Sequence, residues 1–247
     1  MKNLLIPMLV GVMCTSFTII PTLSTVNSES AVAIASHSII PEPPLNITTD
    51  AATTIYASAN LQQYGLSDEA FQYAWKGYQK LLNNKLISRS EYLTICDFSQ
   101  PSSKKRLYIV DVENKKLVIN TYVAHGKNSG AEYATRFSNT PESLQSSLGF
   151  YVTANTYIGA HGLSLRINGV DRGYNDKALA RTIVIHGAAY VDPARAKAGV
   201  FMGRSYGCPA VPQKESAEII TTIKNGTCLF IYHPGKAYLN GSKILNG

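Results

Sequence analysis

Short apolar segments separated by turns fill the chain from Leu93 onward, and this pattern constrains the fold most. The segments are residues 93–98, 107–112, 117–123, 149–153, 157–159, 163–167, 182–185 and 227–232. Each is long enough for a strand, and residues 163–167 alternate apolar with polar side chains. Helices do not alternate regularly with these strands, which argues against a parallel Rossmann-like sheet. We therefore expect a β-rich α+β fold, a β-sandwich or partly open barrel with a few helices.

Two other segments have the period of an amphipathic helix. After Ser67, apolar side chains recur every three or four positions as far as Leu82, and Asn83 and Asn84 can end the helix. The apolar stripe of this helix needs a surface to cover, so we expect an N-terminal helix that docks on the β-rich part. The second helix is predicted over residues 212–224, with Pro212 in its first turn.

The first 36 residues have the features of a secretory leader. Lys2 precedes an interrupted apolar stretch, residues 4–20, and small residues follow. Met13 before Cys14 argues against lipid attachment at that cysteine. We therefore expect export to the periplasm or cell envelope and no transmembrane span in the mature chain. Proline-rich residues 37–60 are predicted to form an extended linker, residues 61–90 a helical lead-in, and residues 91–247 the main domain.

The charge of the chain bears on its partners. The formal net charge is +7, and removing residues 1–36 leaves it unchanged because Lys2 and Glu29 cancel. A basic exported protein suggests an anionic partner, such as a wall polymer, a membrane surface or nucleic acid, although a basic protein need not have one. Lysines and arginines with interleaved aromatic residues do not form a dense patch in the sequence, so no nucleic-acid partner is expected.

Three cysteines remain after the leader. Cys96 and Cys228 lie in apolar, strand-like runs and are expected to be small buried side chains, with a disulfide between them as the alternative. Cys208 differs, because it lies between Gly207 and Pro209 in a loop. Its thiol is the candidate nucleophile of the chain.

His186 is the candidate base for this thiol. A thiol is a weak nucleophile until a base removes its proton, and imidazole is the commonest partner. His186 ends the apolar segment 182–185, and the turn around Cys208 supplies backbone amides that can bind an oxyanion. The alternative is that both residues are structural.

Other chemistries have weaker support. The possible zinc ligands His125, His161, His186 and Cys208 lack the short spacings of metal motifs, so no metal and no cofactor are expected. Ser205 lacks the glycines of a serine-hydrolase motif. His125 and His161 either border the substrate groove or are structural.

The residues around Cys208 and His186 also match a known family. The matching segments are 97–102, 123–126, 137–139, 146–151, His186-Gly187-Ala188 and Gly203-Arg204-Ser205-Tyr206-Gly207-Cys208-Pro209-Ala210. From about residue 61 to 231 the chain resembles the murein L,D-transpeptidase catalytic domain family (YkuD-like). The resemblance implies a β-rich catalytic fold, peptidoglycan stem peptides as substrate, an acylated Cys208 and a basic His186. It places Ser205, Tyr206 and Gly207 at the oxyanion hole, with Gly187 beside the catalytic histidine.

One departure from the family pattern concerns the acceptor side of the groove. Where the family commonly has a histidine two residues before the nucleophile, this chain has Tyr206. His186 is therefore the sole histidine base. The polar or basic residue that the family has two positions after the cysteine is also missing, since Pro209-Ala210 stands there. Arg204 is a candidate to hold a substrate carboxylate in its place, or forms a surface ion pair. We expect a monomeric L,D-transpeptidase. The alternatives are an L,D-carboxypeptidase, in which water is the acceptor, a peptidoglycan-binding module without turnover, and a zinc hydrolase.

Overall fold

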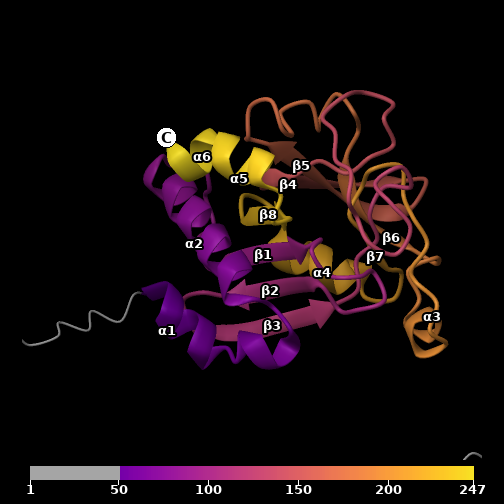
Figure 1. Ribbon diagram of the computed structural model, residues 1–247, viewed down its shortest axis with the longest axis horizontal. Helices are drawn as coiled ribbons and strands as arrows, with labels where there is room; N and C mark the ends of the chain where they lie inside the picture. Colours follow the sequence, from indigo (N-terminus) through magenta and orange to yellow (C-terminus); the bar gives the residue numbers. More distant parts are fainter. Residues whose placement is uncertain (1–50) are drawn as a thin grey trace, which may run out of the picture. The chain divides into compact units, whose positions relative to one another are not determined.

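The computed structural model describes residues 51–247 (Figure 1). The predicted leader, residues 1–36, and the linker up to residue 50 lie outside this range. The described residues form one mixed sheet of eight strands, in the order β3-β2-β1-β8-β4-β5-β6-β7. The strands are β1 Tyr92–Asp97, β2 Leu107–Asp111, β3 Lys116–Thr121, β4 Gly149–Gly159, β5 Gly162–Gly169, β6 Val184–Ala188, β7 Ala210–Pro212 and β8 Cys228–Tyr232. Neighbours are antiparallel except for the pairs β1–β8 and β6–β7.

The two ends of the sheet meet just after β3. The chain that leaves β3 pairs Ala124 with Ala210 of β7, and the Ala124 amide donates to the Ala210 carbonyl at 2.8 Å. A second bridge joins Gly126 to Ser205. The sheet is thereby nearly closed into a barrel, which confirms the predicted β-rich fold with a few helices. The segment with the Cys208 turn lies at this closure.

The helices are short apart from one. They are α1 Ala51–Ser58, η1 Leu61–Tyr64 (a 3₁₀ helix), α2 Asp68–Asn83, α3 Pro193–Lys197, α4 Ser216–Ile223, α5 Lys236–Gly241 and α6 Lys243–Asn246. Helix α2 begins where the sequence predicts, since the Ser67 hydroxyl accepts from the Ala70 amide, and Asp68 and Glu69 lie in its first turn.

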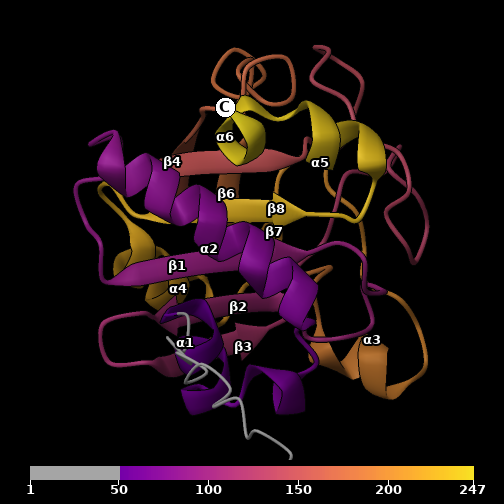
Figure 2. The same cartoon turned by 60° about the vertical axis from the view of Figure 1, so that its left-hand side comes forward.

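Helix α2 lies across one face of the sheet, over β1 and β8 (Figure 2). Gly77 allows the close approach, because a Cβ there would lie 1.9 Å from Cζ of Phe150 in β4. Tyr73 stacks on Tyr232 of β8 with the ring centroids 6.2 Å apart. The predicted docking of this helix is confirmed. Burial of its apolar stripe, and not its own propensity, is what stabilises it.

The predicted linker is wrong for residues 51–58, which form α1. This segment has helix-forming alanines, and it buries Ala52 and Ile55 in the same core as α2. The Tyr56 ring lies 5.7 Å from the Phe71 ring, and its hydroxyl donates to the Leu66 carbonyl at 2.7 Å. The prolines within residues 41–44 favour an extended chain, but the predicted linker continued past them into a segment that is helical.

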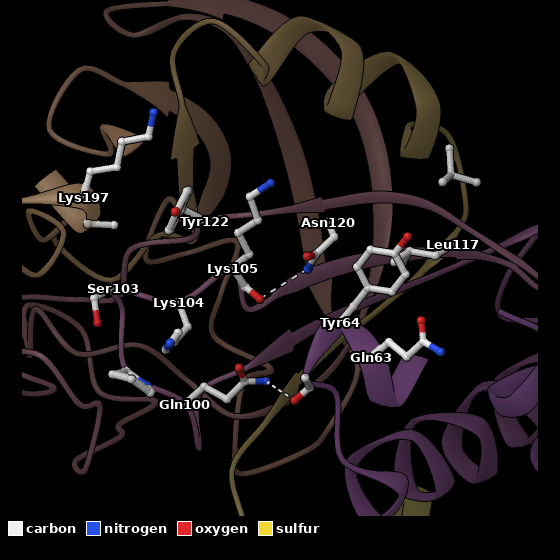
Figure 3. Close-up of a pocket in the computed structure, with 14 residues that line it drawn as sticks. Gln63, Tyr64, Gln100, Ser103, Lys104, Lys105, Leu117, Asn120, Tyr122 and Lys197 are labelled. Carbon is white, nitrogen blue, oxygen red and sulfur yellow. Dashed lines mark hydrogen bonds between the residues drawn. The ribbon is translucent and has the colours of Figure 1, made fainter. Parts of the chain in front are cut away.

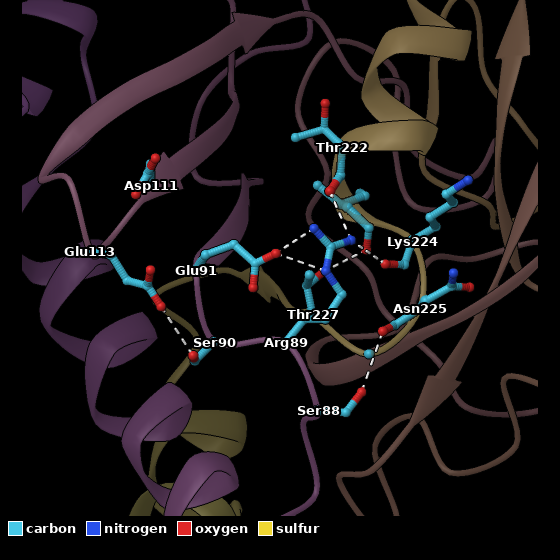
Figure 4. Close-up of polar contacts among 12 residues, drawn as sticks. Ser88, Arg89, Ser90, Glu91, Asp111, Glu113, Thr222, Lys224, Asn225 and Thr227 are labelled. Carbon is cyan, nitrogen blue, oxygen red and sulfur yellow. Dashed lines mark hydrogen bonds and ion pairs between the residues drawn. The ribbon is translucent and has the colours of Figure 1, made fainter.

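Arg89 ties the segment after α2 to the end of α4 (Figure 4). Its guanidinium donates to the carbonyls of Thr222 (3.2 Å) and Lys224 (2.6 Å), and also pairs with Glu91. A cation at a helix C-terminus satisfies carbonyls that have no partner within the helix. Arg89 thus anchors the lead-in to the helix that packs against β5 and β6.

Two predicted boundaries near the candidate site are wrong. The helix predicted over 212–224 begins at Ser216, because Pro212 lies in edge strand β7. The strand predicted over 182–185 begins at Val184, because Thr182 has the left-handed φ of 55°. His186 therefore lies within β6, not at its end. In residues 51–247, no helix combines the length and apolarity needed to cross a bilayer.

Candidate active site

The pairing of β6 with β7 brings His186 and Cys208 into one neighbourhood. In this parallel pair, His186 lies opposite Ala210, so Cys208 is in the turn just before the paired residue. The Val184 amide donates to Sγ of Cys208 at 3.5 Å, and the thiol donates to the Thr182 carbonyl at 3.8 Å. The candidate nucleophile therefore lies beside the start of the strand that carries the candidate base.

His186 is oriented by its own strand. It is 3% exposed, and its Nδ1 lies 2.9 Å from the Gly187 carbonyl oxygen. A carbonyl only accepts, so the hydrogen resides on Nδ1 and Nε2 keeps a free lone pair. Burial lowers the pKa of His186, the neighbouring His161 lowers it further, and the Gly187 carbonyl partly opposes both. The ring is thus held as a neutral base.

The surroundings of Cys208 favour the neutral thiol over the thiolate. Burial raises the pKa of its thiol, while the Val184 amide and the Arg181 guanidinium lower it. Among the described residues, no hydrogen bond joins Sγ to the His186 ring, because the thiol donates to the Thr182 carbonyl instead. Rotation about the Cys208 Cα–Cβ bond can redirect the thiol without moving the backbone.

The turn that carries Cys208 is built by Ser205. Its hydroxyl donates to the Cys208 carbonyl at 2.6 Å and accepts from the Gly207 amide at 3.0 Å. Gly207 has a φ of 127°, which side chains rarely adopt, and a Cβ there would lie 2.9 Å from the Gln145 carbonyl oxygen. Ser146 donates to the Gly207 carbonyl at 3.2 Å. The turn is therefore fixed from both sides.

The five residues predicted to bind substrate or oxyanion have different surroundings. The amides of Ser205 and Gly207 are already engaged, with the His125 carbonyl (3.0 Å) and the Ser205 hydroxyl. Tyr206 is 68% exposed, and the Lys127 ammonium lies 4.7 Å from its ring centroid. Arg204 is exposed and donates to the Gly130 carbonyl at 3.1 Å. A Cβ on Gly187 would lie 2.7 Å from Ser216 Oγ, so this glycine packs β6 against the start of α4.

The turn that carries Cys208 is also supported by a buried cation, Arg106, through His125. Arg106 is fully buried and donates to the Val123 carbonyl (2.9 Å) and to Nδ1 of His125 (2.8 Å). Its guanidinium also lies 4.6 Å from the Phe98 ring centroid. Burial lowers the pKa of Arg106 to about 9, and burial together with Arg106 lowers the pKa of His125 to about 4. His125 is thus a neutral structural residue whose carbonyl holds the Ser205 amide.

Comparison with known families identifies this arrangement. Residues 62–232 match the family model described as the L,D-transpeptidase catalytic domain, which spans most of the chain and includes His186 and Cys208. The chain belongs to that family. The match confirms the family that the resemblance of the sequence predicted. The comparison with curated proteins gave no match.

Solved structures of L,D-transpeptidases are among the similar folds. An L,D-transpeptidase from Mycobacterium smegmatis is 11% identical, with 58% of this chain and 59% of that chain covered and a TM-score of 0.36. One from Xylanimonas cellulosilytica is 15% identical, with 72% and 92% covered and a TM-score of 0.32. The helical cell shape determining protein Pgp2 from Campylobacter jejuni is 14% identical, with 65% and 57% covered and a TM-score of 0.37. The chain thus spans about three fifths of the first of these relatives.

The sequence analysis of this L,D-transpeptidase domain missed Arg181 and the contact between His161 and His186. Arg181 donates to the carbonyls of Ser138 (2.7 Å) and Gln145 (2.6 Å), which fastens the loop that covers the Cys208 turn. His161, from the turn between β4 and β5, stacks on His186. Arg181 directly precedes the apolar segment 182–185, and this position could have indicated a cation near the candidate site. Nothing in the sequence indicates the stacking of the two histidines.

The other two cysteines of the domain do not enter the site. Cys96 and Cys228 are free and fully buried, which confirms the expectation of small buried side chains and excludes the disulfide. Burial raises the pKa of the Cys96 thiol to about 12 and also raises that of Cys228. In the described part of the chain, no group of three or more His, Cys, Asp and Glu side chains is arranged to hold a metal ion.

Proposed function

We propose that this protein is a cysteine-dependent peptidoglycan L,D-transpeptidase in which Cys208 is the nucleophile and His186 the base. The single observation that carries the proposal is the β6–β7 register, which sets the Cys208 turn beside a buried His186 whose Nε2 is free to accept a proton. The family match to residues 62–232 supports the reaction class.

The proposed reaction starts with rotation of the Cys208 side chain away from the Thr182 carbonyl. His186 Nε2 takes the thiol proton, and the thiolate attacks the stem-peptide carbonyl that precedes the terminal D-alanine. The new C–S bond forms as the carbonyl π bond opens. Collapse of the tetrahedral intermediate then breaks the C–N bond, and His186 returns its proton to the departing D-alanine amine.

An amine from a second stem peptide completes the proposed cycle. It attacks the thioester carbonyl, His186 takes its surplus proton, and the Cys208 thiolate leaves and is reprotonated. Water in place of this amine gives carboxypeptidase activity. The oxyanion of both intermediates is proposed to be bound by turn amides at Tyr206 and Cys208, since those of Ser205 and Gly207 are engaged in the turn itself.

The surface residues near the turn are proposed to contact the substrate. Arg204 presents a cation from an exposed position, and Tyr206 presents an exposed ring with the Lys127 ammonium over it. Stem peptides end in carboxylates, which suit both cations. Export to the cell envelope, directed by the first 36 residues, and a monomeric state belong to the same proposal.

Mass spectrometry of a muropeptide reaction tests the proposal. The protein and its Cys208→Ala variant are incubated with a disaccharide-tetrapeptide, and Cys228→Ala is the control because that thiol is buried in the core. A dimer that has lost one terminal alanine, formed by the wild type and Cys228→Ala but not by Cys208→Ala, is the expected result. A shortened monomer alone would replace the transpeptidase with a carboxypeptidase. Equal activity of Cys208→Ala would contradict the mechanism.

A further inference from the structure

A hollow of about 980 Å³ lies apart from the Cys208 turn. Four segments line it: the end of η1, the loop after β1, strand β3 with Tyr122, and the last turn of α3 (Figure 3). Neither Cys208 nor His186 is among its lining residues. We call it the lysine groove and define it by six residues that line it. These are Tyr64, Lys104, Lys105, Asn120, Tyr122 and Lys197.

Three ammonium groups stand around the groove without acidic partners. Lys104 and Lys105 extend from the loop after β1, and Lys197 from α3, and all three are exposed (Figure 3). In residues 51–247, the ion pairs within 4.0 Å are Arg89–Glu91 and Lys116–Asp111, so none involves these lysines. Glu132 lies at the rim, where its carboxylate accepts from the Ser103 hydroxyl at 2.7 Å. With three lysines and one glutamate around it, the groove has a net positive charge, which favours an anionic ligand.

The walls of the groove are held in place by hydrogen bonds. Gln100 donates to the Gly65 carbonyl at 3.1 Å, and the Tyr108 hydroxyl donates to the Tyr64 carbonyl at 3.0 Å, which fixes the end of η1. Asn120 donates to the Lys105 carbonyl at 3.2 Å and thereby fixes the loop relative to β3. Binding there does not require these segments to be ordered first, which lowers the entropy cost of association.

The uncharged lining suits sugar rings. Tyr64 is 52% exposed, and its ring, together with that of Tyr122, offers an apolar face with a polar edge. The side-chain amide of Gln63 can bind hydroxyls. The side-chain carbonyl oxygens of Gln100 and Asn120 can also accept from hydroxyls, while their nitrogens hold the walls. All cations of the lining are lysines, which act as point charges and lack the planar fork that reads phosphate or base edges in two places at once. Acidic groups spaced along a flexible polymer fit this pattern better than nucleic acid does.

We propose that the lysine groove binds a polysaccharide that carries anionic groups. The identity of this polymer as bacterial wall material rests on the proposed function. The groove is linked to the active site by covalent and hydrogen-bonded structure, because α3 leads into the Cys208 turn and the Met202 amide donates to the Ser102 hydroxyl beside the groove at 3.2 Å. A polymer held there keeps its other stem peptides close to Cys208, which raises their effective concentration.

Sedimentation with insoluble cell-wall sacculi tests the groove. All proteins carry Cys208→Ala, so that no acylation occurs. The test variant adds K104Q/K105Q/K197Q, and the matched control adds K85Q/K115Q/K177Q, three exposed lysines outside the groove. Both triple variants lose three units of charge, so bulk charge is equal. We expect the dissociation constant of the test variant to rise about tenfold at low salt and that of the control to stay within about twofold.

Further arms identify the ligand. Sacculi treated with hydrofluoric acid, which removes phosphate-linked polymers, distinguish stem-peptide carboxylates from phosphates as the source of charge. Uncharged chitin should not bind. Three results would each overturn the proposal. They are an equal loss of affinity for sacculi in the two triple variants, binding to chitin as tight as binding to sacculi, and displacement from sacculi by single-stranded DNA at a lower concentration than by soluble wall fragments.

Activity measurements separate this inference from the proposed function. With Cys208 intact, K104Q/K105Q/K197Q should cross-link the soluble disaccharide-tetrapeptide as fast as the wild type, and only the KM for polymeric substrate should rise. Slowing of the reaction with the short substrate would assign the lysines to the active site and overturn a separate groove. Absence of any reaction in the wild type would contradict the proposed function, while the sedimentation result would still decide the groove.

Discussion

The imidazole of His161 lies flat on that of His186, with ring centroids 4.3 Å apart and ring planes 20° from parallel. His161 is exposed in the tight turn between β4 and β5, whereas His186 is buried in β6. The stack shields one face of the His186 ring from water. It also places a second titratable group against it, and two adjacent imidazoles resist being charged together.

Replacing His161 should change the pH dependence of the thiol. His161→Ala removes the neighbouring charge and exposes His186, so the pKa of His186 should rise towards its ordinary value. Since the neutral ring is the proposed base, the acid limb of Cys208 alkylation should move to higher pH. His161→Phe keeps a stacked ring without charge and should move the acid limb less. NMR titration of the His186 imidazole gives the direct measurement, and an unchanged pKa in His161→Ala would refute the coupling.

Arg181 should control the reactivity of Cys208 at neutral pH. Its guanidinium lowers the pKa of the thiol and holds the loop at Ser138 and Gln145. In Arg181→Gln, the thiol pKa should rise and iodoacetamide labelling at pH 7 should slow by about three- to tenfold. Arg181→Lys keeps the charge and should recover part of the rate. If Arg181→Gln labels as fast as the wild type from pH 6 to 9, the electrostatic role is wrong.

The sequence was informative wherever local patterning decides the structure. The Ser67 cap and the helical period after it predicted α2. The apolar segments predicted every strand of the sheet except β7, although β4 was expected as two separate pieces. The start of β6 was missed because a left-handed φ at Thr182 leaves no trace in apolar spacing. His186 and Cys208 could be paired from motifs, but the contact of His161 with His186 depends on how far the β4–β5 hairpin extends beside β6. Such distances are set by strand register, which a single sequence does not specify.

The buried His125 should make the fold sensitive to acid. Its pKa is about 4 in the folded protein and near 6.5 in the unfolded chain. Between these values the unfolded state binds more protons, so the free energy of unfolding should fall as pH drops through 6.5 towards 4, by up to roughly 3 kcal/mol. His125→Asn keeps an acceptor for Arg106 and should be less stable at pH 7 but flatter across this window. Urea unfolding at several pH values measures both slopes, and equal slopes would exclude His125 as the source.

Gly207→Ala should lower the activity of the protein without unfolding it. The φ of 127° at this position costs a side chain about 1–3 kcal/mol, and the added Cβ would press on the Gln145 carbonyl 2.9 Å away. The turn must shift, which moves Cys208 relative to the Val184 amide and His186. We expect alkylation and cross-linking to fall by about tenfold or more while the circular dichroism spectrum is retained. Gly173→Ala is the control, because Gly173 also has a left-handed φ of 85° but faces open space far along the chain from Cys208. Equal loss of activity in both variants would assign the effect to general strain, and full activity of Gly207→Ala would show that the Cys208 turn tolerates a different backbone.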